Sequence, residues 1–183
     1  AAVAEAFARH PEAVMVTGDT LLTDPAGRPV MLDTVLAPSH RQMRYAMAVP
    51  QQSTFFRRDA YRAAGGMDTR FTYCMDYDLF ERISRQGKIV RIPRLVATFR
   101  LHPSAKTATW REVFKREIYA CQHRHGAGAW HEFLIKLVGV EIRVQSLMAQ
   151  CGALLGGRRL PTRVNARIEP MRALARKKHG LIG

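Results

Sequence analysis

The sequence predicts a mixed α/β domain over residues 1–107, followed by a basic α-helical extension over residues 108–183. Short β-rich runs alternate with helical patterns in the first part, and only helical patterns follow residue 107. The chain has 183 residues, of which 47% are hydrophobic and 24% are charged, a composition that favours a packed core over disorder. Most of the net charge of +14 lies in the last part, because residues 103–183 carry 15 Lys and Arg but only 5 Asp and Glu.

Runs of apolar and β-branched residues predict strands. They lie at residues 13–17, 21–23, 29–32, 53–57, 89–92 and 96–99. Asp24-Pro25-Ala26-Gly27 separates the second run from the third, and these residue types favour a tight turn, so we expect a hairpin there. Asp19 is also expected to form a turn. The run at residues 53–57 is continuous rather than alternating, which is typical of a strand covered on both faces.

Residues with helical spacing or helix end signals predict the helices. These segments lie at residues 1–9, 39–47, 58–64, 76–86, 130–148 and 170–179. Gly65-Gly66 is expected to stop the third helix, and Gly87 is expected to cap the end of the fourth. Within the fourth helix, the buried stripe should consist of Leu79, Phe80 and Ile83. Asp78 should pair with Arg82, one helical turn later.

The cysteines and histidines do not form a recognisable ligand pattern. Cys74, Cys121 and Cys151 are widely spaced and include no CxxC pair, which argues against a disulfide framework or a zinc knuckle and favours a reducing compartment. His123, His125 and the remaining histidines other than His102 are too scattered to suggest a metal site. No stretch approaches the ~20 apolar residues that a membrane span needs.

The segment from Pro50 to Thr107 carries an ordered set of motifs. An apolar-apolar-Arg-Arg strand end, a Gly-Gly-apolar-Asp turn and an acidic residue opening a helix come first. A Gly-Lys-apolar-apolar-x-Ile-Pro strand follows, and then an Arg and a His. This set resembles the inverting family-two glycosyltransferases, and the similarity extends to residues 10–33. The resemblance implies a partial GT-A (nucleotide-diphospho-sugar transferase) domain with a mixed sheet. Residues 1–107 would be its acceptor-side, C-terminal half.

The same resemblance implies that part of the enzyme lies elsewhere. The family's Asp-x-Asp metal motif ends a core strand in the nucleotide-binding half, and Asp76-Tyr77-Asp78 does not match it, because this triplet opens a helix after a Gly-Gly turn. The chain also starts within a helical pattern. We therefore expect the encoded protein to continue upstream of Ala1 with the nucleotide-binding half, without which this segment should be inactive.

Asp76 is the expected catalytic residue. In the family, an Asp at the start of this helix acts as the general base and takes the proton from the acceptor hydroxyl. A carboxylate held rigidly at a helix start suits that task. Met75 stands where the family usually has Glu. The alternative is that Asp76 only caps the helix, a common role for aspartate.

Further site residues follow from the resemblance. Arg100 and Lys106 would meet the donor diphosphate, and His102 would complete the site of a divalent cation, Mg or Mn. The amides of Gln51 and Gln52 suit sugar hydroxyls, and ordinary loop polarity is the alternative. The site residues on the sugar or acceptor side would also include the glycines of the turn, Gly65 and Gly66. For these two, a simple helix stop is equally compatible with the local sequence.

The expected function is transfer of a sugar from a nucleotide-diphospho-sugar donor to a glycan or lipid-linked acceptor, with inversion. We expect a cytoplasmic protein that can also contact the inner face of an anionic membrane peripherally through its basic extension; solvated helix faces are the simpler interpretation of that charge. The alternative function is a non-catalytic basic module that binds anionic lipid or nucleic acid. Nucleic acid is not the expected partner, because no zinc pattern, aromatic ribonucleoprotein motif or clear helix-turn-helix accompanies the charge.

Overall fold

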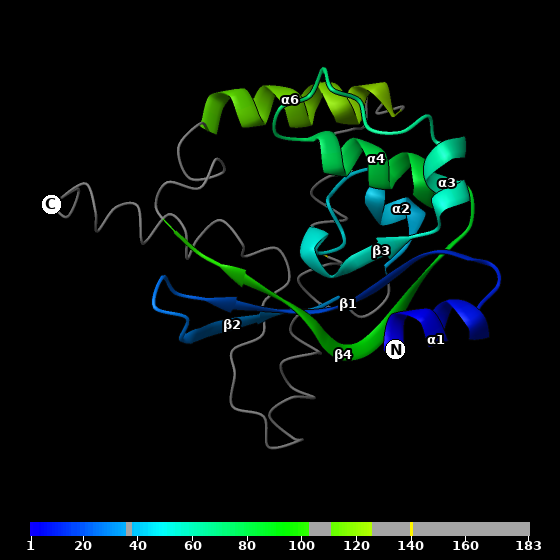
Figure 1. Cartoon of the computed structure of the whole chain (residues 1–183). Helices are drawn as coiled ribbons and strands as arrows, with labels where there is room; N and C mark the ends of the chain where they lie inside the picture. Colours follow the sequence, from blue (N-terminus) through cyan, green and yellow to red (C-terminus); the bar gives the residue numbers. More distant parts are fainter. Residues whose placement is uncertain (36–37, 103–110, 126–139, 141–183) are drawn as a thin grey trace, which may run out of the picture.

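The computed structural model describes residues 1–35, 38–102, 111–125 and 140, which form a mixed α/β fold (Figure 1). Its strands build one open four-stranded sheet. The α/β prediction is therefore confirmed. None of the helices that the structure describes has both the length and the apolar character needed to cross a bilayer.

The central strand of the sheet is β1 (Ala13–Thr23), which pairs with all three other strands. Its first half is antiparallel to β3 (Thr54–Phe56) and its second half is antiparallel to β2 (Pro29–Asp33). Along its whole length β1 is parallel to β4 (Lys88–Arg100). The sheet is mixed, because β1 is antiparallel to its neighbours β2 and β3 on one edge and parallel to β4 on the other.

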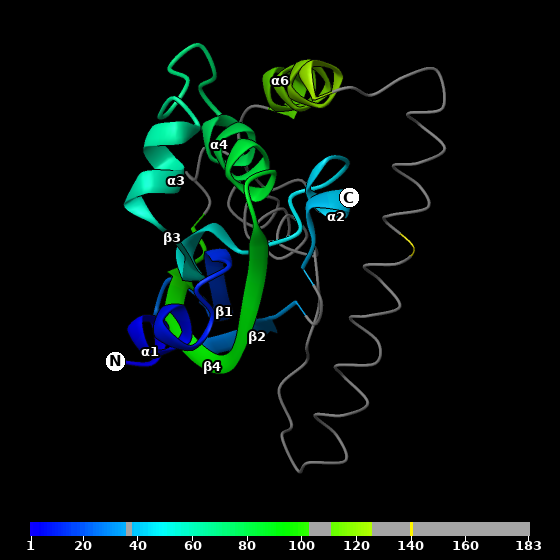
Figure 2. The same cartoon turned by 90° about the vertical axis from the view of Figure 1, so that its right-hand side faces the viewer.

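Helices cover the sheet on both faces (Figures 1 and 2). On one face, α1 (Ala2–Arg9) packs through Ala6 against Val16 of β1 and Ile92 of β4. On the other face, Met15 of β1 belongs to a larger core. This core includes residues from α2 (His40–Met43), α3 (Arg58–Ala63), α4 (Met75–Ser84) and α6 (Arg111–Arg124). The helix α6 lies outside α4, so this side of the molecule has two helical layers.

The predicted hairpin turn and the predicted helix start at Ser39 are confirmed. The hairpin of β1 and β2 closes where Asp24 accepts a hydrogen bond from the backbone N–H of Arg28 at 2.9 Å, and Gly27 has φ of +84°. The helix expected at residues 39–47 begins after Ser39, whose hydroxyl accepts from the N–H of Gln42 at 3.3 Å. It is shorter than predicted and ends at Met43.

Arg57 fastens α1 to the sheet. Its guanidinium donates to the carbonyl of Ala13 at 2.7 Å and to the carbonyls of Phe7 and His10 at 2.9 and 3.2 Å. The same group lies over the Phe7 ring, 4.9 Å from its centroid. The carbonyls of Phe7 and His10 lie at the end of α1, where C=O groups without a partner in the helix attract cations. The first arginine of the apolar-apolar-Arg-Arg motif therefore has a structural role, because it holds α1 against the sheet.

Several strand predictions were wrong in their boundaries or environment. The runs at residues 13–17 and 21–23 belong to the single strand β1, and those at 89–92 and 96–99 belong to the single strand β4. Register shifts in the β1–β4 ladder around Asp19 accommodate the Pro93-Arg94 segment without ending the strand. In β3, Phe55 is 40% exposed, so this strand is not covered on both faces.

Gly87 and Asp19 also serve other purposes than predicted. Among the described glycines, positive φ occurs at Gly27, Gly65 and Gly66, so Gly87 is not a left-handed helix cap. A Cβ on Gly87 would instead lie 2.7 Å from the Val14 side chain and 2.8 Å from the carbonyl of Glu12, because β4 begins in close contact with β1. Asp19 is buried within β1 and accepts hydrogen bonds from Arg91, at 3.0 Å, and from Thr34.

Most of the basic extension lies outside the described residues. This includes the helices predicted at residues 170–179 and, apart from Val140, at 130–148. The described part, α6, contributes buried Cys121 and partly buried Ile118 to the same core as α4. The domain boundary after residue 107 remains a prediction.

Candidate functional site

Asp76 lies in the first turn of α4, one position after the first helical residue. The N-cap is Cys74, so Asp76 itself is not the cap. The Asp76 carboxylate accepts a hydrogen bond from the backbone N–H of Tyr77 at 2.8 Å, and the side chain is partly buried. This arrangement holds a carboxylate on a rigid element while leaving part of it accessible, which a general base requires.

A carboxylate from another helix caps the start of α4. Glu117 of α6 accepts backbone hydrogen bonds from Thr72 at 3.0 Å, Tyr73 at 2.6 Å and Cys74 at 3.2 Å. Cys74 makes no side-chain capping bond of its own. The first N–H groups of a helix lack partners within the helix, and a negative charge there is favourable. Glu117 therefore stabilises the segment that leads directly to Asp76.

The other residues expected around the sugar lie on two short elements. Gln51 is exposed and Gln52 is partly buried in η1 (Gln51–Ser53), which contacts both β1 and β4. Gly65 and Gly66 follow α3 with φ of +79° and +73°, and the N–H of Gly66 donates to the Tyr61 carbonyl at 3.1 Å. The two glycines thus end α3 as predicted, and a role beside the sugar remains a prediction.

The residues expected at the diphosphate and the cation lie where β4 ends. Arg100 is the last residue of β4, pairs with Thr23 of β1 and is exposed. His102 follows two positions later and is also exposed. Lys106 lies outside the described residues. In Figure 1, β4 ends at the left of the sheet, whereas α4 begins in the helical layer above the sheet, nearer the middle of the molecule.

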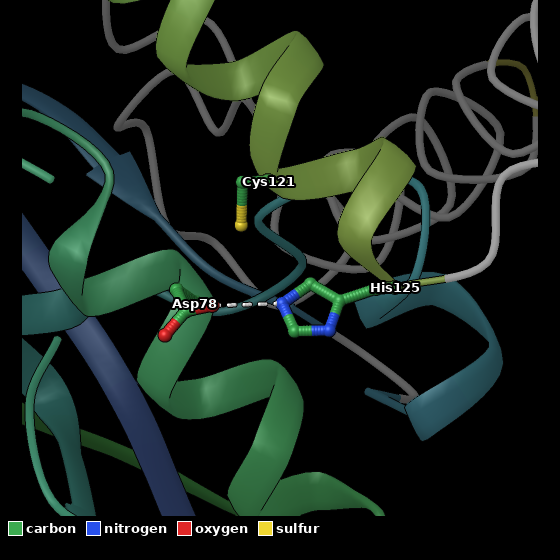
Figure 3. A group of neighbouring side chains, drawn as sticks. All are labelled: Asp78, Cys121 and His125. Atoms are coloured by element: carbon green, nitrogen blue, oxygen red, sulfur yellow. Dashed lines mark hydrogen bonds and ion pairs between the residues drawn. The ribbon is translucent and has the colours of Figure 1, made fainter. Parts of the chain in front are cut away.

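A buried cluster of charged residues joins α4 to α6 (Figure 3). Asp78 and Glu81 of α4 have no exposed side-chain surface, and the side chain of His125, immediately after α6, is 2% exposed. The imidazole lies between the two carboxylates: Nε2 is 3.0 Å from Asp78 and Nδ1 is 2.8 Å from Glu81. A doubly protonated ring can donate to both, which pairs each buried carboxylate.

Arginines complete this cluster from its solvent side. Arg82 pairs with Asp78 at 2.6 Å, which confirms the predicted pair one turn apart, and Arg85 pairs with Glu81 at 2.9 Å. Arg124 of α6 reaches Asp78 at 3.4 Å and also pairs with Asp68. Arg85 lies 2.9 Å from His125 Nδ1 as well. Because an imidazolium Nδ1–H and a guanidinium both donate, we assign this contact to two donors that share Glu81.

The environment of His125 keeps it protonated. Burial by itself lowers the pKa of His125, but hydrogen bonds with Asp78, Cys121 and Glu81 outweigh burial and raise the pKa to about 10. Burial raises the pKa of the Asp78 and Glu81 carboxyls, and hydrogen bonds from His125 and the arginines reverse this effect, so both pKa values are lowered. The cluster therefore consists of ion pairs at neutral pH.

The fold brings together three side chains that could hold a metal ion. Ligand atoms of Asp78, Cys121 and His125 lie within 4.8 Å of one another, so the fold brings His125 close to two other possible ligands, which its place in the sequence did not indicate. A cation there would have to displace the imidazolium proton. It would also have to deprotonate Cys121, whose thiol pKa is raised by burial. Arg82 and Arg124 already pair with Asp78. The arrangement suits an ion-pair clamp better than a metal centre.

Sequence reasoning missed both links between α6 and α4. Glu117 and its backbone partners are 43 to 45 positions apart, and His125 is 47 positions from Asp78. Neither spacing has a recognisable periodicity. On the predicted helix, Asp78 and Glu81 lie opposite the stripe of Leu79, Phe80 and Ile83, which indicates a solvent-facing side rather than a contact with a second helical layer.

No model of a protein family matches this chain, and no curated protein matches it.

Proposed function

We propose that this chain is the acceptor-side part of a glycosyltransferase that moves a sugar from a nucleotide-diphosphate donor to a hydroxyl of a glycan or lipid-linked acceptor. Asp76 is the general base. The observation that carries the proposal is the placement of Asp76: it is partly accessible in the first turn of α4, directly after a segment that Glu117 of α6 holds by three backbone hydrogen bonds.

The proposed reaction is a single displacement. The acceptor hydroxyl gives its proton to the Asp76 carboxylate as its oxygen forms a bond to the anomeric carbon. The bond between that carbon and the diphosphate oxygen breaks on the opposite face, and the nucleoside diphosphate leaves with the electron pair. Inversion follows because attack and departure are in line.

The departing diphosphate carries negative charge that the site has to offset. Arg100 is exposed at the end of β4, and a guanidinium forms strong charge-assisted hydrogen bonds to phosphate oxygens. His102, two positions later, could supply one imidazole ligand to a divalent cation, Mg or Mn, which would neutralise the diphosphate when bound. The proposal gives none of the described residues a contact with the nucleoside.

The substitution Asp76→Asn tests this proposal. It should be introduced into the whole protein encoded by the gene that carries this chain. Turnover can be followed as release of nucleoside diphosphate from a panel of UDP-, GDP- and dTDP-sugars. Asn keeps the shape of the side chain but cannot take up the acceptor proton, so turnover should fall by about 10² to 10⁴-fold. Donor affinity and thermal stability should change little.

A matched control is available in α3. Asp59 occupies the corresponding position in the first turn of that helix and is exposed. The substitution Asp59→Asn therefore makes the same change in charge and shape at a helix start, and it should leave turnover unchanged. Near-normal turnover by a well-folded Asp76→Asn protein would falsify the assignment of the base.

The positive charge of the extension favours a second candidate function. Residues 103–183 carry 15 Lys and Arg against 5 Asp and Glu, and charge of this kind attracts anionic surfaces. Within the described part, Tyr119 of α6 is 57% exposed and its ring lies 4.2 Å from the ring of the exposed His123, tilted by 56°, so an aromatic ring accompanies the charge. This candidate is a basic module that binds anionic lipid without catalysis.

A further inference from the structure

Several hydrogen bonds from the segment before α4 converge on the carboxylate of Glu117. One carboxylate accepts from three successive backbone N–H groups, those of Thr72, Tyr73 and Cys74, at distances of 2.6 to 3.2 Å. Hydrogen bonds to an ionised acceptor are stronger than bonds between neutral groups. The carboxylate also lies where the helix dipole of α4 is positive. The segment 72–74 is therefore fixed by a residue far away in the sequence.

The N-cap Cys74 is 1% exposed and makes no side-chain capping bond. The next residue, Met75, has no hydrogen-bonding group suited to an N-terminus. Asp76 bonds the N–H of Tyr77, which lies one residue further into the helix. Glu117 thus holds the three residues that lead directly into the first turn of α4.

Glu117 is itself held in place by the rest of α6. Gln122 donates to the carbonyl of Tyr45 at 2.7 Å, and Cys121 is fully buried in the core. At the end of the helix, Arg124 and His125 bind the carboxylates of α4. These attachments lie one to two turns beyond Glu117 and fix the position of α6 against α4 and the segment that follows α2. The carboxylate therefore meets the N–H groups from a rigid support.

We propose that Glu117 is a positioning residue for Asp76, and this role rests on the proposed function of Asp76 as the base. Glu117 fixes residues 72–74, and these fix the first turn of α4, on which the Asp76 carboxylate is mounted. It does not touch the substrate. Small displacements of a reacting group are costly in rate, about 10²-fold for 1 Å, so a loosened first turn should slow the proton transfer.

The first test measures the contact without using activity. Amide hydrogen exchange should be compared between the wild-type protein and the variants Glu117→Gln and Glu117→Ala. Exchange at the amides of residues 72–74 should become at least about 10-fold faster in Glu117→Ala, because their charged acceptor is gone. The charge-matched control Glu5→Gln, in α1 on the opposite face of the sheet, should leave these amides unchanged. Unchanged exchange in Glu117→Ala would overturn the proposal.

The second test measures turnover in the whole protein with the nucleotide sugar that it accepts. Glu117→Gln should lower kcat by about 10-fold and leave KM for the donor unchanged, because the loss affects the placement of the base and not donor binding. Glu117→Asp, which keeps the charge on a shorter side chain, should recover part of the loss. Equal turnover of Glu117→Gln and wild type would overturn the proposal.

A double variant separates positioning from a general loss of stability. If Glu117 acts through Asp76, the combination of Glu117→Gln with Asp76→Asn should be no slower than Asp76→Asn alone. Losses that multiply would show that Glu117 acts independently of Asp76. Near-normal turnover of Asp76→Asn would overturn the proposed base, and the role of Glu117 with it. A slow Asp76→Asn enzyme with multiplying losses would overturn only the role of Glu117.

Discussion

The substitution His125→Gln should remove a large pH-dependent part of the stability. His125 contributes through its pKa, which is raised from 6.5 to about 10 in the folded protein. In the unfolded chain the ring loses its proton near the ordinary value, while the folded protein keeps it. The contribution is therefore fully present below about pH 6.5 and is lost as the pH rises through about 10.

The magnitude follows from linkage. Between the two pKa values the folded state binds one proton more than the unfolded state, so the free energy of unfolding should fall by about 1.4 kcal/mol per pH unit. From about pH 7.0 to about pH 8.5 the expected loss is roughly 2 kcal/mol. The side chain is only 2% exposed, so solvent screening does not reduce this figure substantially.

The other groups with a shifted pKa contribute little to the change in stability over this pH range. The pKa of His40 is lowered by burial from 6.5, so His40 changes the stability only at pH values below about 7.0. Burial raises the pKa of the Cys121 thiol above its ordinary value of 9.0, so this thiol affects stability mainly above the window. The carboxyls of Asp78 and Glu81, whose pKa values are lowered, are ionised throughout in both states.

The assay is urea unfolding at several pH values, followed by circular dichroism. Wild type should lose about 2 kcal/mol across the window, and His125→Gln should lose much less while being less stable at about pH 7.0. His123→Gln is the matched control, because His123 lies two positions earlier in the last turn of α6 and is exposed. If wild type and His125→Gln show the same pH dependence, the imidazolium between two carboxylates is not what joins α6 to α4.

Two further perturbations address the sheet and the basic extension. Gly87→Ala should destabilise the fold by about 1–3 kcal/mol in thermal or urea unfolding, because the new methyl group would lie 2.7 Å from Val14 and 2.8 Å from the Glu12 carbonyl; unchanged stability would contradict this close approach. If the extension meets anionic membranes, vesicles with acidic lipid should bind the whole chain and release it as salt shortens the Debye length to about 3 Å at 1 M; equal binding to neutral vesicles in high salt would point to apolar insertion instead.

The elements predicted correctly from the sequence are those whose causes are local. The hairpin depends on Asp24 and Gly27, which lie within the turn they form. The helix α4 depends on the spacing of Leu79, Phe80 and Ile83, all of them buried as predicted. In both cases the residue types that decide the conformation are neighbours in the chain, and the sequence displays them directly.

The wrong predictions concern residues whose roles depend on contacts far away in the sequence. The sequence predicts a strand end at Pro93-Arg94, but register shifts against β1 let β4 continue through this segment. The sequence predicts a helix cap at Gly87, but glycine is needed there because a side chain would clash with Val14 of β1. The role of each of these residues is set by its contact with β1, a strand far away in the sequence, so the neighbouring residues do not indicate it.

The candidate site divides in the same way. The position of Asp76 in the first turn of a helix could be predicted, because the acidic residue and the apolar stripe follow one another in the chain. The supports of that helix could not, because Glu117 and His125 come from α6 across more than 40 positions. The chemical role of Asp76 remains a prediction.

The long parallel ladder between β1 and β4 has a consequence for how the chain reaches its fold. Ala13 pairs with Lys88 and Thr23 pairs with Arg100, so each rung closes a loop of about 75 residues before it gains a contact. The β1–β2 hairpin, closed by a short turn, can form in about 1–10 μs. We therefore expect the hairpin to form early and one edge of β1 to stay open until α3 and α4 have delivered β4. During that interval the apolar side chains of β1 are exposed to other chains, so folding yield should fall as protein concentration rises.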